Sequence, residues 1–439
     1  MIRSPAAILG LLTGLNLLNY LDRYVLSAVL PRLIVDLGLT NLEAGLLATV
    51  FLLGYFVTSP IFGALGDRLP RKGLIALGIL IWSAATIASG LASNIMLLLA
   101  ARAMVGVGEA SYATLAPTVI DDITPTERKG RALSIFYIAT PVGSALGFII
   151  GGIIEKLYGW HAAFFVAGVP GIVLALVMLF IEEPQRKPRE DKPDILRDLG
   201  TLSKVKLYRQ GVLGYCAYTA AIGAFSFWAP QFLFKRYAMS LASANTVFGG
   251  IIVVAGALGT IIGGRWADAQ SKKIDASFKL DPLNPERSFR EQGYRDASPA
   301  EMERLLDEVH QRRVKSLLQI CAVGSLVGAP LAVACFLSPG PTLFFAFAFF
   351  TILFLFLATS PVNAVILQSV PSHLRASAMA LSIFAIHVLG DLWSPPAVGV
   401  LADHLPIQLA MMTLPLAIAA SGAIWWSRVA TNPEIRDEK

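Results

Sequence analysis

The sequence predicts an all-α membrane protein with twelve transmembrane helices in two pseudo-symmetric halves of six helices each. Its 439 residues are 55% hydrophobic and only 15% charged, whereas soluble proteins have about 25% charged residues. The hydrophobic residues gather into twelve runs, and each run has about the 20 residues that a helix needs to cross a bilayer. Two repeated motifs divide these runs into two sets of six.

The predicted spans follow one another along the chain, separated mostly by short loops. They cover residues 6–31, 43–66, 73–93, 95–120, 130–154, 161–181, 207–234, 243–266, 314–337, 341–369, 375–402 and 405–428. Loops rich in Lys and Arg (67–72, 126–131, 182–206 and 267–313) alternate with loops poor in bases. Because basic loops remain on the cytoplasmic side, we expect an integral protein of the plasma membrane, or of the inner membrane in a bacterium, with both termini in the cytoplasm.

The first span carries polar residues well inside its length, in the sequence Asn19-Tyr20-Leu-Asp22-Arg23-Tyr24. A charged side chain at the centre of a bilayer costs about 2.5–3.5 kcal/mol on insertion scales. Asp22 and Arg23 should therefore face protein or a water-filled cavity rather than lipid. Neighbouring positions on a helix point about 100° apart, so we expect one of them to face the centre and the other to meet a neighbouring helix.

The loop between spans 2 and 3 reads Gly63-Ala-Leu-Gly-Asp67-Arg68-Leu-Pro-Arg71-Lys-Gly. It resembles the signature loop of the major facilitator superfamily, with a proline where that family usually has a glycine. Glycines let helices approach closely, and Asp67 is suited to cap a helix start and to pair with a base in one conformation only. We expect a cytoplasmic gate; the alternative is a topology anchor of ordinary basic residues. The expected gate residues are Gly63, Asp67, Arg68, Arg71 and, in a second copy of the motif, Asp268.

Span 4 contains two charges, Arg102 and Glu109, seven residues apart. Seven residues are about two helical turns, so both side chains lie on one face, about 10.5 Å apart along the axis. If spans 1 and 4 are neighbours, Asp22 reaches Arg102, and Glu109 or a substrate competes for the arginines. Such a network would couple a proton on Asp22 or Glu109 to the movement of an arginine. The alternative is a static network that only holds the helices together.

Two motifs recur in the second half of the chain. The sequence Ala132-Leu-Ser-Ile-Phe136 returns 248 residues later, and Gly63-x-x-x-Asp67 returns 201 residues later as Gly264-x-x-x-Asp268. The offsets differ by about the length of a polar insertion at 267–313, so the halves match once it is removed. Repeated halves are typical of transporters that rock about a central site. We expect an N-terminal half (1–181), a charged, Pro-rich cytoplasmic linker (182–206) and a C-terminal half (207–439).

The insertion at 267–313 contains a stretch with helical character from Ser298 to Val314. Ser298 and Pro299 are typical of a helix start, and Glu301 suits the positive end of a helix. We expect an amphipathic cytoplasmic helix at the membrane surface, with a role in gating or lipid contact. A solvated loop without function is the alternative.

Span 11 carries the sequence His387-Val-Leu-Gly-Asp391-Leu-Trp-Ser-Pro395-Pro396. His387 and Asp391 are four residues apart and share one face of a helix. The two prolines interrupt the backbone hydrogen bonds, which is common where a span must bend.

Together, the motifs of span 1 (Asn-Tyr-Leu-Asp-Arg), span 4 (Arg-x-x-x-Gly-x-Gly-Glu-Ala-Ser-Tyr) and span 11 (His-Val-Leu-Gly-Asp-x-x-Ser-Pro) resemble those of the spinster family of major facilitators. The resemblance covers most of the chain. It implies proton-coupled transport, by alternating access, of an amphiphile such as a lysophospholipid or sphingosine 1-phosphate, here in a bacterial member of the family. It implies proton coupling through Asp22 and Glu109, and a headgroup or charge network of Arg23, Arg102, Tyr20, His387 and Asp391. Aromatic residues in spans 7 and 10 would suit a lipid tail, or simply the protein core.

Other functional classes find little support in the sequence. We identify no nucleophile with a base, no metal-ligand spacing and no nucleotide-binding loop, so we expect no enzyme, no cofactor and no metal. The three cysteines lie in apolar runs and are interpreted as core residues. The expected partners are a small amphiphilic or anionic substrate, protons and membrane lipid, with the chain a monomer; the bases fall between spans, so nucleic acid is not expected. Transport of a non-lipid organic anion or drug, and lipid scrambling, remain as alternatives.

Overall fold

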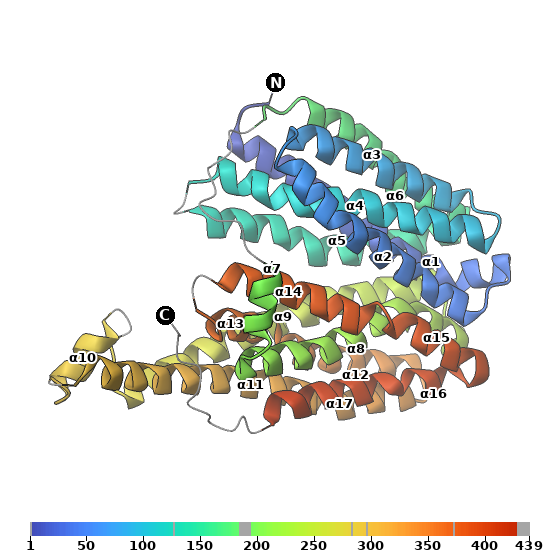
Figure 1. Ribbon diagram of the computed structural model, residues 1–439. Coiled ribbons are helices and arrows are strands. Elements are labelled where there is room, and N and C mark those ends of the chain that lie inside the picture. The colour runs from blue at the N-terminus through green and yellow to red at the C-terminus, as the bar shows by residue number, and fades with distance from the viewer. Residues whose placement is uncertain are drawn as a thin grey trace.

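The computed structural model describes residues 2–125, 128–183, 195–281, 284–295, 297–371 and 374–427. This part of the chain is almost entirely helical (Figure 1), and eleven of its helical segments are long and apolar enough to cross a membrane. The twelfth span is α1 (Pro5–Leu37), whose 33 residues are also long enough. Its hydropathy is lowered by polar side chains in its middle, among them Asn16, Asn19, Asp22 and Arg23. The prediction of twelve spans in two halves is confirmed.

The first half consists of six helices that pack against one another. After α1 come α2 (Asn41–Gly66), α3 (Arg71–Gly90), α4 (Ile95–Ile123), α5 (Lys129–Tyr158) and α6 (Trp160–Leu179). Helix α1 packs on α5, while α4 lies between α2 and α3. This arrangement brings the polar middle of α1 close to the charged face of α4.

The second half repeats this plan with more interruptions. Its spans are α8 (Lys206–Tyr237), α9 (Leu241–Ser277), α11 (Pro299–Leu337), α12 with α13 (Pro341–Phe356, Thr359–Gln368), α14 with η3 and α15 (Arg375–Ile386, His387–Asp391, Ser394–His404), and α16 with α17 (Ile407–Met411, Thr413–Trp426). The short element η3 is a π-helix. It ends at Asp391, shortly before Pro395 and Pro396 of span 11, where we expected the span to be interrupted.

Several helices begin where a side chain caps the backbone. At the start of α4, Asn94 Oδ1 accepts a hydrogen bond from the Leu97 N–H at 3.0 Å. Thr40 and Glu43 form a capping box at the start of α2, and Ser298 and Glu301 form one at the start of α11. Such caps satisfy backbone N–H groups that the helix itself leaves unpaired, so these starts are determined locally.

The bundle has two distinct ends. One end, which we call the terminal end, contains the first and last described residues. Ile2 is hydrogen-bonded there to Phe180 at the end of α6, and Ser427 to Gln210 at the start of α8. We call the opposite end the distal end. Between described residues, the hydrogen bonds that join the two halves involve Asn41, Leu42, Thr49 and Ala28 of the first half and Asp403, Ala402, Leu392, Lys235 and Asn245 of the second. They lie toward the distal end, and the ribbons of the two halves separate toward the terminal end (Figure 1).

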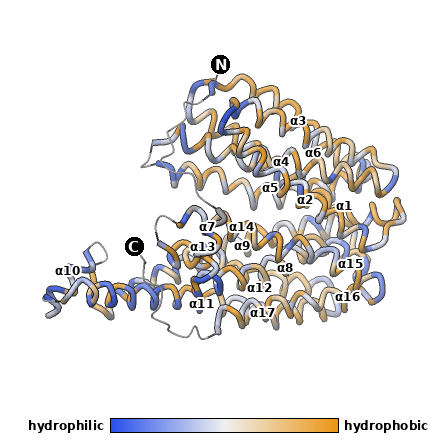
Figure 2. The backbone as a smooth tube through the Cα atoms, viewed as in Figure 1, coloured by the Kyte–Doolittle hydropathy of each residue, from blue (hydrophilic) through white to orange (hydrophobic). Residues whose placement is uncertain are grey.

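The hydropathy of the chain follows this architecture. Figure 2 shows hydrophobic residues along the length of the bundle and hydrophilic residues concentrated at its ends and on the projecting insertion. This distribution matches a bundle whose sides face lipid and whose ends face water.

The insertion differs from our expectation of a separate helix at the membrane surface. The predicted start at Ser298 is correct, but α11 continues from Pro299 to Leu337 without a break. It runs beside the extended end of α9 and the short helix α10 (Pro285–Glu291), and the insertion projects from the bundle (Figure 1). No Gly or Pro occurs between residues 300 and 323, so nothing breaks the helix where it leaves the membrane. A small apolar core holds the projection together, formed by Leu280, Phe289, Met302 and Val309.

Part of the predicted linker is visible as α7 (Ile195–Leu202). The Asp198 carboxylate on this helix accepts a hydrogen bond from Ser377 Oγ on α14, so α7 is attached to the second half. Residues 184–194 of the predicted linker and residues 428–439 of the predicted C-terminal half lie outside the described residues.

Candidate functional site

The polar residues of span 1 lie at the centre of the first half. Asp22 is completely buried, and Asn19 is 3% exposed. Arg23, one position further along α1, keeps 27% of its side chain exposed. The two charged neighbours thus point to different surroundings, as the geometry of a helix requires.

Arg23 forms an ion pair with Glu109 on α4. Its Nη2 donates to Glu109 Oε2 at 2.6 Å, and the Glu109 side chain is completely buried. The guanidinium of Arg23 also lies over the rings of Tyr20, at 5.0 Å, and Phe51, at 4.8 Å. The pair therefore has one buried member and one member that remains accessible.

The glycines before Glu109 explain why its side chain is enclosed. A Cβ on Gly106 would lie 2.0 Å from the backbone oxygen of Phe51 on α2, and one on Gly108 would lie 2.5 Å from the oxygen of Gly78 on α3. Neither site has room for a side chain, so α2 and α3 approach the backbone of α4 closely on either side. The Gly-x-Gly-Glu sequence thereby places a carboxylate where water has little access.

Asp22 and Arg102 form the buried part of the same network. Thr86 Oγ1 on α3 donates a hydrogen bond to Asp22 Oδ2. Arg102 is 1% exposed, and its guanidinium lies 5.2 Å from the centre of the Phe51 ring. Arg102 interacts electrostatically with both Asp22 and Glu109. Phe51 therefore contacts both guanidinium groups.

The expected direct contact between Asp22 and Arg102 does not form. Among the described side chains, no ion pair within 4.0 Å joins them, and Arg102 Nε and Nη1 have no hydrogen-bond partner. Asp22 accepts a hydrogen bond from Thr86 on α3, while its neighbour Arg23 forms the ion pair with Glu109 on α4. Thr86 and Phe51 were missed because threonine and phenylalanine are ordinary residues in a membrane span.

His387 and Asp391 are polar residues of the second half that lie near the seam, by which we mean the surface where the two halves meet. His387 Nδ1 lies 2.9 Å from Asp391 Oδ1, and both side chains remain partly exposed, at 26% and 20%. Both residues belong to the π-helix η3. The His387 ring contacts Phe56 of the first half, with 5.5 Å between ring centres, so this pair lies where the two halves meet.

The two groups of charges belong to different halves of the protein. Arg23 on α1 is 27% exposed and Asp391 on η3 is 20% exposed. The central site therefore presents an accessible cation from the first half and an accessible carboxylate from the second.

The expected gate residues occupy the terminal end and have different surroundings. Arg71 is 5% exposed, its Nη1 lies 2.6 Å from Asp122 Oδ2, and its backbone N–H donates to Glu183 at 2.9 Å. Arg68, Asp67 and Asp268 are exposed. Asp122 and Glu183 were not among the predicted gate residues, although the acidic pair at the end of span 4, beside a basic loop, was a usable signal.

Two details of the gate loop differ from expectation. Asp67 lies at the C-terminal end of α2 rather than at a helix start, because α2 continues through the glycines up to that residue. The close approach of helices occurs at Gly66, where a Cβ would lie 2.3 Å from Leu115, and not at Gly63, where the nearest atom is at 3.7 Å.

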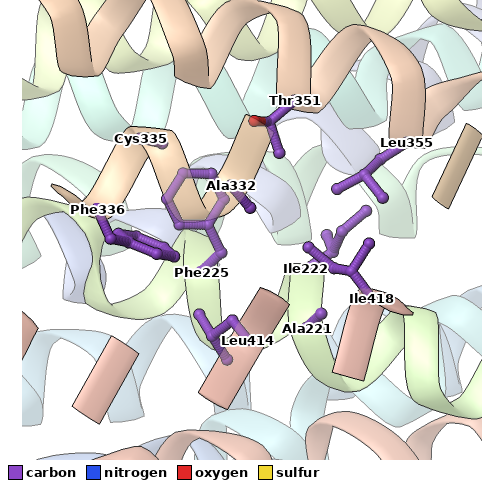
Figure 3. Close-up of a pocket in the computed structure, with 10 residues that line it drawn as sticks. All are labelled: Ala221, Ile222, Phe225, Ala332, Cys335, Phe336, Thr351, Leu355, Leu414 and Ile418. Atoms are coloured by element: carbon purple, nitrogen blue, oxygen red, sulfur yellow. The ribbon is translucent and has the colours of Figure 1, made fainter. Parts of the chain in front are cut away.

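Aromatic residues of span 7 pack into the core of the second half together with Phe344 of span 10, whereas Phe350 of span 10 is 50% exposed. Phe225 contacts the rings of Phe248 and Phe336, with centres 5.4 and 5.6 Å apart. A small apolar cavity remains beside them, lined by Phe225, Phe336, Thr351 and Leu355 among others (Figure 3). Phe225, Phe227, Trp228 and Phe344 are therefore part of the core of the second half. Across the described residues, no group of three or more His, Cys, Asp or Glu could hold a metal ion.

Comparison with known proteins gives a consistent result. Residues 12–276 match the family model described as Major Facilitator Superfamily. The chain is 30% identical to "Probable sphingolipid transporter spinster homolog 2" of Arabidopsis thaliana, covering 96% of this chain and 86% of that protein. It is 33% identical to "Protein spinster homolog 1" of Homo sapiens (91% and 73% covered) and 31% identical to "Sphingosine-1-phosphate transporter SPNS2" of Danio rerio (92% and 77%).

Solved structures share the fold. A bacterial homologue of the human lysosomal transporter spinster, in an inward-facing and occupied conformation, superimposes with a TM-score of 0.77 at 20% identity over 96% of each chain. A D-xylose–proton symporter superimposes with a TM-score of 0.70 at 16% identity, over 95% of this chain and 96% of that chain. Both comparisons support the arrangement of twelve spans in two halves.

Proposed function

Because the chain belongs to the spinster family of the major facilitator superfamily, a family of membrane transporters, we propose that it is a proton-coupled secondary transporter of a lysophospholipid or a sphingosine 1-phosphate-like amphiphile. It works by alternating access between the two halves, as a monomer. The observation that carries the proposal is the ion pair between the accessible Arg23 and the buried Glu109.

The charges of the central site match a headgroup that has both a phosphate and an amine. Arg23 retains donors that a phosphate would bind, whereas Arg102 is 1% exposed and out of reach of a substrate in this conformation. On the other half, Asp391 and His387 are accessible to an ammonium group. Tyr20 lies beneath the Arg23 guanidinium and would keep it oriented. We therefore assign the phosphate to Arg23 and the amine to Asp391.

Proton coupling follows from competition for Arg23. A phosphate that binds Arg23 weakens its bond to Glu109, and a buried carboxylate that loses its cation favours the protonated form. Asp22 provides a second buried carboxylate under the influence of the same arginines. Glu109 Oε1 and Asp22 Oδ1 have no hydrogen-bond partner among the described residues, so each carboxyl group has an oxygen available for a proton.

The gate lies at the terminal end, which we place in the cytoplasm because the basic loops gather there. Arg71, held by Asp122 and Glu183, fixes the junction between α3, α4 and the end of the first half. Gly63, Asp67, Arg68 and, on α9, Asp268 lie at the same end. We propose that these residues meet across the halves when the terminal end closes.

The proposal is tested by flux into proteoliposomes under a pH gradient. We expect saturable uptake of lysophosphatidylethanolamine that depends on the gradient and is abolished by Glu109→Gln. The matched control is Glu155→Gln, which removes the same kind of ion pair from the distal end, where Glu155 Oε1 lies 3.1 Å from Arg32 Nε. This control should transport like the wild type.

Two other results would overturn the lipid assignment. Uptake of organic acids without uptake of lysolipid would show a transporter of non-lipid anions. Exchange of lipid between leaflets that neither saturates nor responds to Glu109→Gln or Asp22→Asn would show a scramblase.

A further inference from the structure

A contact at the distal end joins the two halves through a carboxylate that the transport site does not use. Asp403, near the end of α15, reaches the first turn of α2 in the other half. Its Oδ1 accepts hydrogen bonds from the Asn41 backbone N–H at 2.7 Å and from Asn41 Nδ2 at 2.8 Å. Its Oδ2 accepts one from the Leu42 N–H at 3.0 Å. Asp403 thus caps a helix that belongs to the opposite half.

Helix α2 already has a cap within its own half. The Thr40 hydroxyl accepts from the Glu43 N–H, and the Glu43 carboxylate accepts from the Thr40 N–H. A helix start leaves four N–H groups unpaired, and a carboxylate is stabilised there by the helix dipole. Asp403 satisfies N–H groups that this capping box leaves free, and it does so only while the two halves are in contact.

A second bond depends on the prolines of span 11. Pro396 has no N–H, so the carbonyl of Leu392, four residues earlier, lacks its helical partner. Thr49 Oγ1 on α2 donates to this carbonyl at 2.7 Å, in a buried position. A carbonyl that the second half cannot satisfy by regular helix formation is satisfied by a hydroxyl of the first half.

Two glycines make the contact close. A Cβ on Gly45 would lie 2.6 Å from Pro396 Cα, and one on Gly399 would lie 2.4 Å from the Asn41 carbonyl oxygen. The backbones of α2 and α15 touch here, so a small separation of the halves breaks the bonds of Asp403 and Thr49 together. Such a contact has two discrete states, made and broken.

We infer that Asn41, Thr49 and Asp403, with Gly45 and Gly399, form a distal latch that favours the conformation closed at the distal end. Asp403 is a positioning residue: it sets the ratio of the two conformations and touches no substrate. The inference rests on the proposed alternating access, because the latch exists in only one of the two alternating states.

The test measures distance across the distal end of the reconstituted full-length protein. Met96 on α4 and Leu409 on α16 are exposed and belong to different halves, so spin labels on Met96→Cys and Leu409→Cys report their separation. The three native cysteines are buried. We expect Asp403→Asn and Thr49→Val each to raise the ratio of long to short distances roughly tenfold, the scale of one lost bond to a charged or buried group.

The matched control is Glu43→Gln. Glu43 caps the same helix from within its own half, so this change weakens the start of α2 but leaves the seam intact, and the distances should remain those of the wild type. Gly399→Ala forces the backbones apart without altering any charge, and should shift the distances in the same direction as Asp403→Asn.

The inference fails if Asp403→Asn and Gly399→Ala leave the distances as in the wild type, or if Glu43→Gln shifts them equally. In either case Asp403 is only a helix cap. The measurement needs no substrate and no pH gradient, so its outcome does not depend on whether the protein transports lysolipid. Failure of the flux experiment with a working latch would point to another substrate.

Discussion

Arg102 is a buried cation between two buried carboxylates. It lies in contact with Phe51 and interacts electrostatically with Asp22 and Glu109, yet a substrate cannot reach it. We propose that Arg102 holds the charge balance of the network while Arg23 exchanges Glu109 for a ligand. Removal of one member of a buried charge network leaves the others without compensation.

Arg102→Ser tests this role. We expect transport to fall roughly tenfold or more, which corresponds to a loss of about 1.4 kcal/mol in the transport step, while the protein still inserts and elutes as a single species from detergent. Flux in proteoliposomes and size-exclusion chromatography measure the two properties. Arg236→Ser, at an exposed position near the end of α8, is the control and should transport like the wild type. Normal flux through Arg102→Ser at normal expression would exclude the role.

A separate prediction concerns the hydrogen bond between Thr86 and Asp22. Thr86→Val keeps the shape of the side chain but removes the hydroxyl that donates to Asp22. A buried polar group that loses its partner costs about 1–3 kcal/mol, so we expect a lower unfolding temperature in detergent. Thr58→Val, which removes a hydroxyl bonded only to the Gly54 carbonyl of its own helix, should have a smaller effect. Equal effects of the two changes would show that the bond to Asp22 is unimportant.

The sequence predicted which charges are buried but not how they pair. Charges inside apolar runs must face the protein, and this argument brought Asp22, Arg23, Arg102 and Glu109 into one region. Their partners depend on the rotation of α1 and on its approach to α3, which periodicity alone does not define. Hence Thr86 and Phe51 became visible only in the structure.

At the scale of the elements, α4 is the helix around which the first half packs. Its glycines allow α2 and α3 to approach closely, and this approach encloses Glu109. A methyl group at Gly106 would lie 2.0 Å from the Phe51 carbonyl oxygen, and backbone atoms cannot yield as a flexible side chain does.

Gly106→Ala should therefore separate α2 from α4. We expect a loss of about 1–3 kcal/mol of stability, the usual cost of overpacking, together with reduced transport because Glu109 and Phe51 move. Thermal unfolding in detergent measures the first effect and flux the second. In Gly14→Ala on α1 the new methyl group meets nothing within 4 Å, and this control should keep normal stability. A normal unfolding temperature for Gly106→Ala would show that the helices can yield.

Most helix starts were predicted well because they depend on local signals, whereas α1 and α9 extend beyond the predicted ends at residues 31 and 266. Hydrophobic length places the start of α4 at Ile95, and Ser298 marks the start of α11, in both the sequence and the structure. The direction of the insertion was not predicted, because it depends on α11 remaining unbroken and on packing against the extension of α9. The contact of Leu392 with Thr49 was also hidden: the prolines indicated an interrupted span, but not which residue of the other half would satisfy the free carbonyl.

At the scale of the whole molecule, the position of the seam determines which end of the protein exposes the central site. The halves are joined at the distal end, and Tyr137 on α5 lies away from that seam with 53% of its area exposed. Further along the same helix, a Cβ on Gly143 would lie 3.0 Å from Cβ of Tyr20, which lies beside Arg23. A reagent dissolved in water should thus reach this position from the terminal end.

Labelling of Tyr137→Cys tests the orientation of the protein in the membrane and which end of the bundle is open. We expect a membrane-impermeant maleimide to label it from the cytoplasmic side at least about tenfold faster than it labels Ala145→Cys. Ala145 is 5% exposed and lies in the seam beside Gly249, and buried thiols react slowly. Lysophosphatidylethanolamine should slow the labelling of Tyr137→Cys, because a headgroup on Arg23 would occupy the space beside Tyr20. Faster labelling from the opposite side would mean that the terminal end is not cytoplasmic, and labelling that lysolipid leaves unchanged would place the substrate elsewhere.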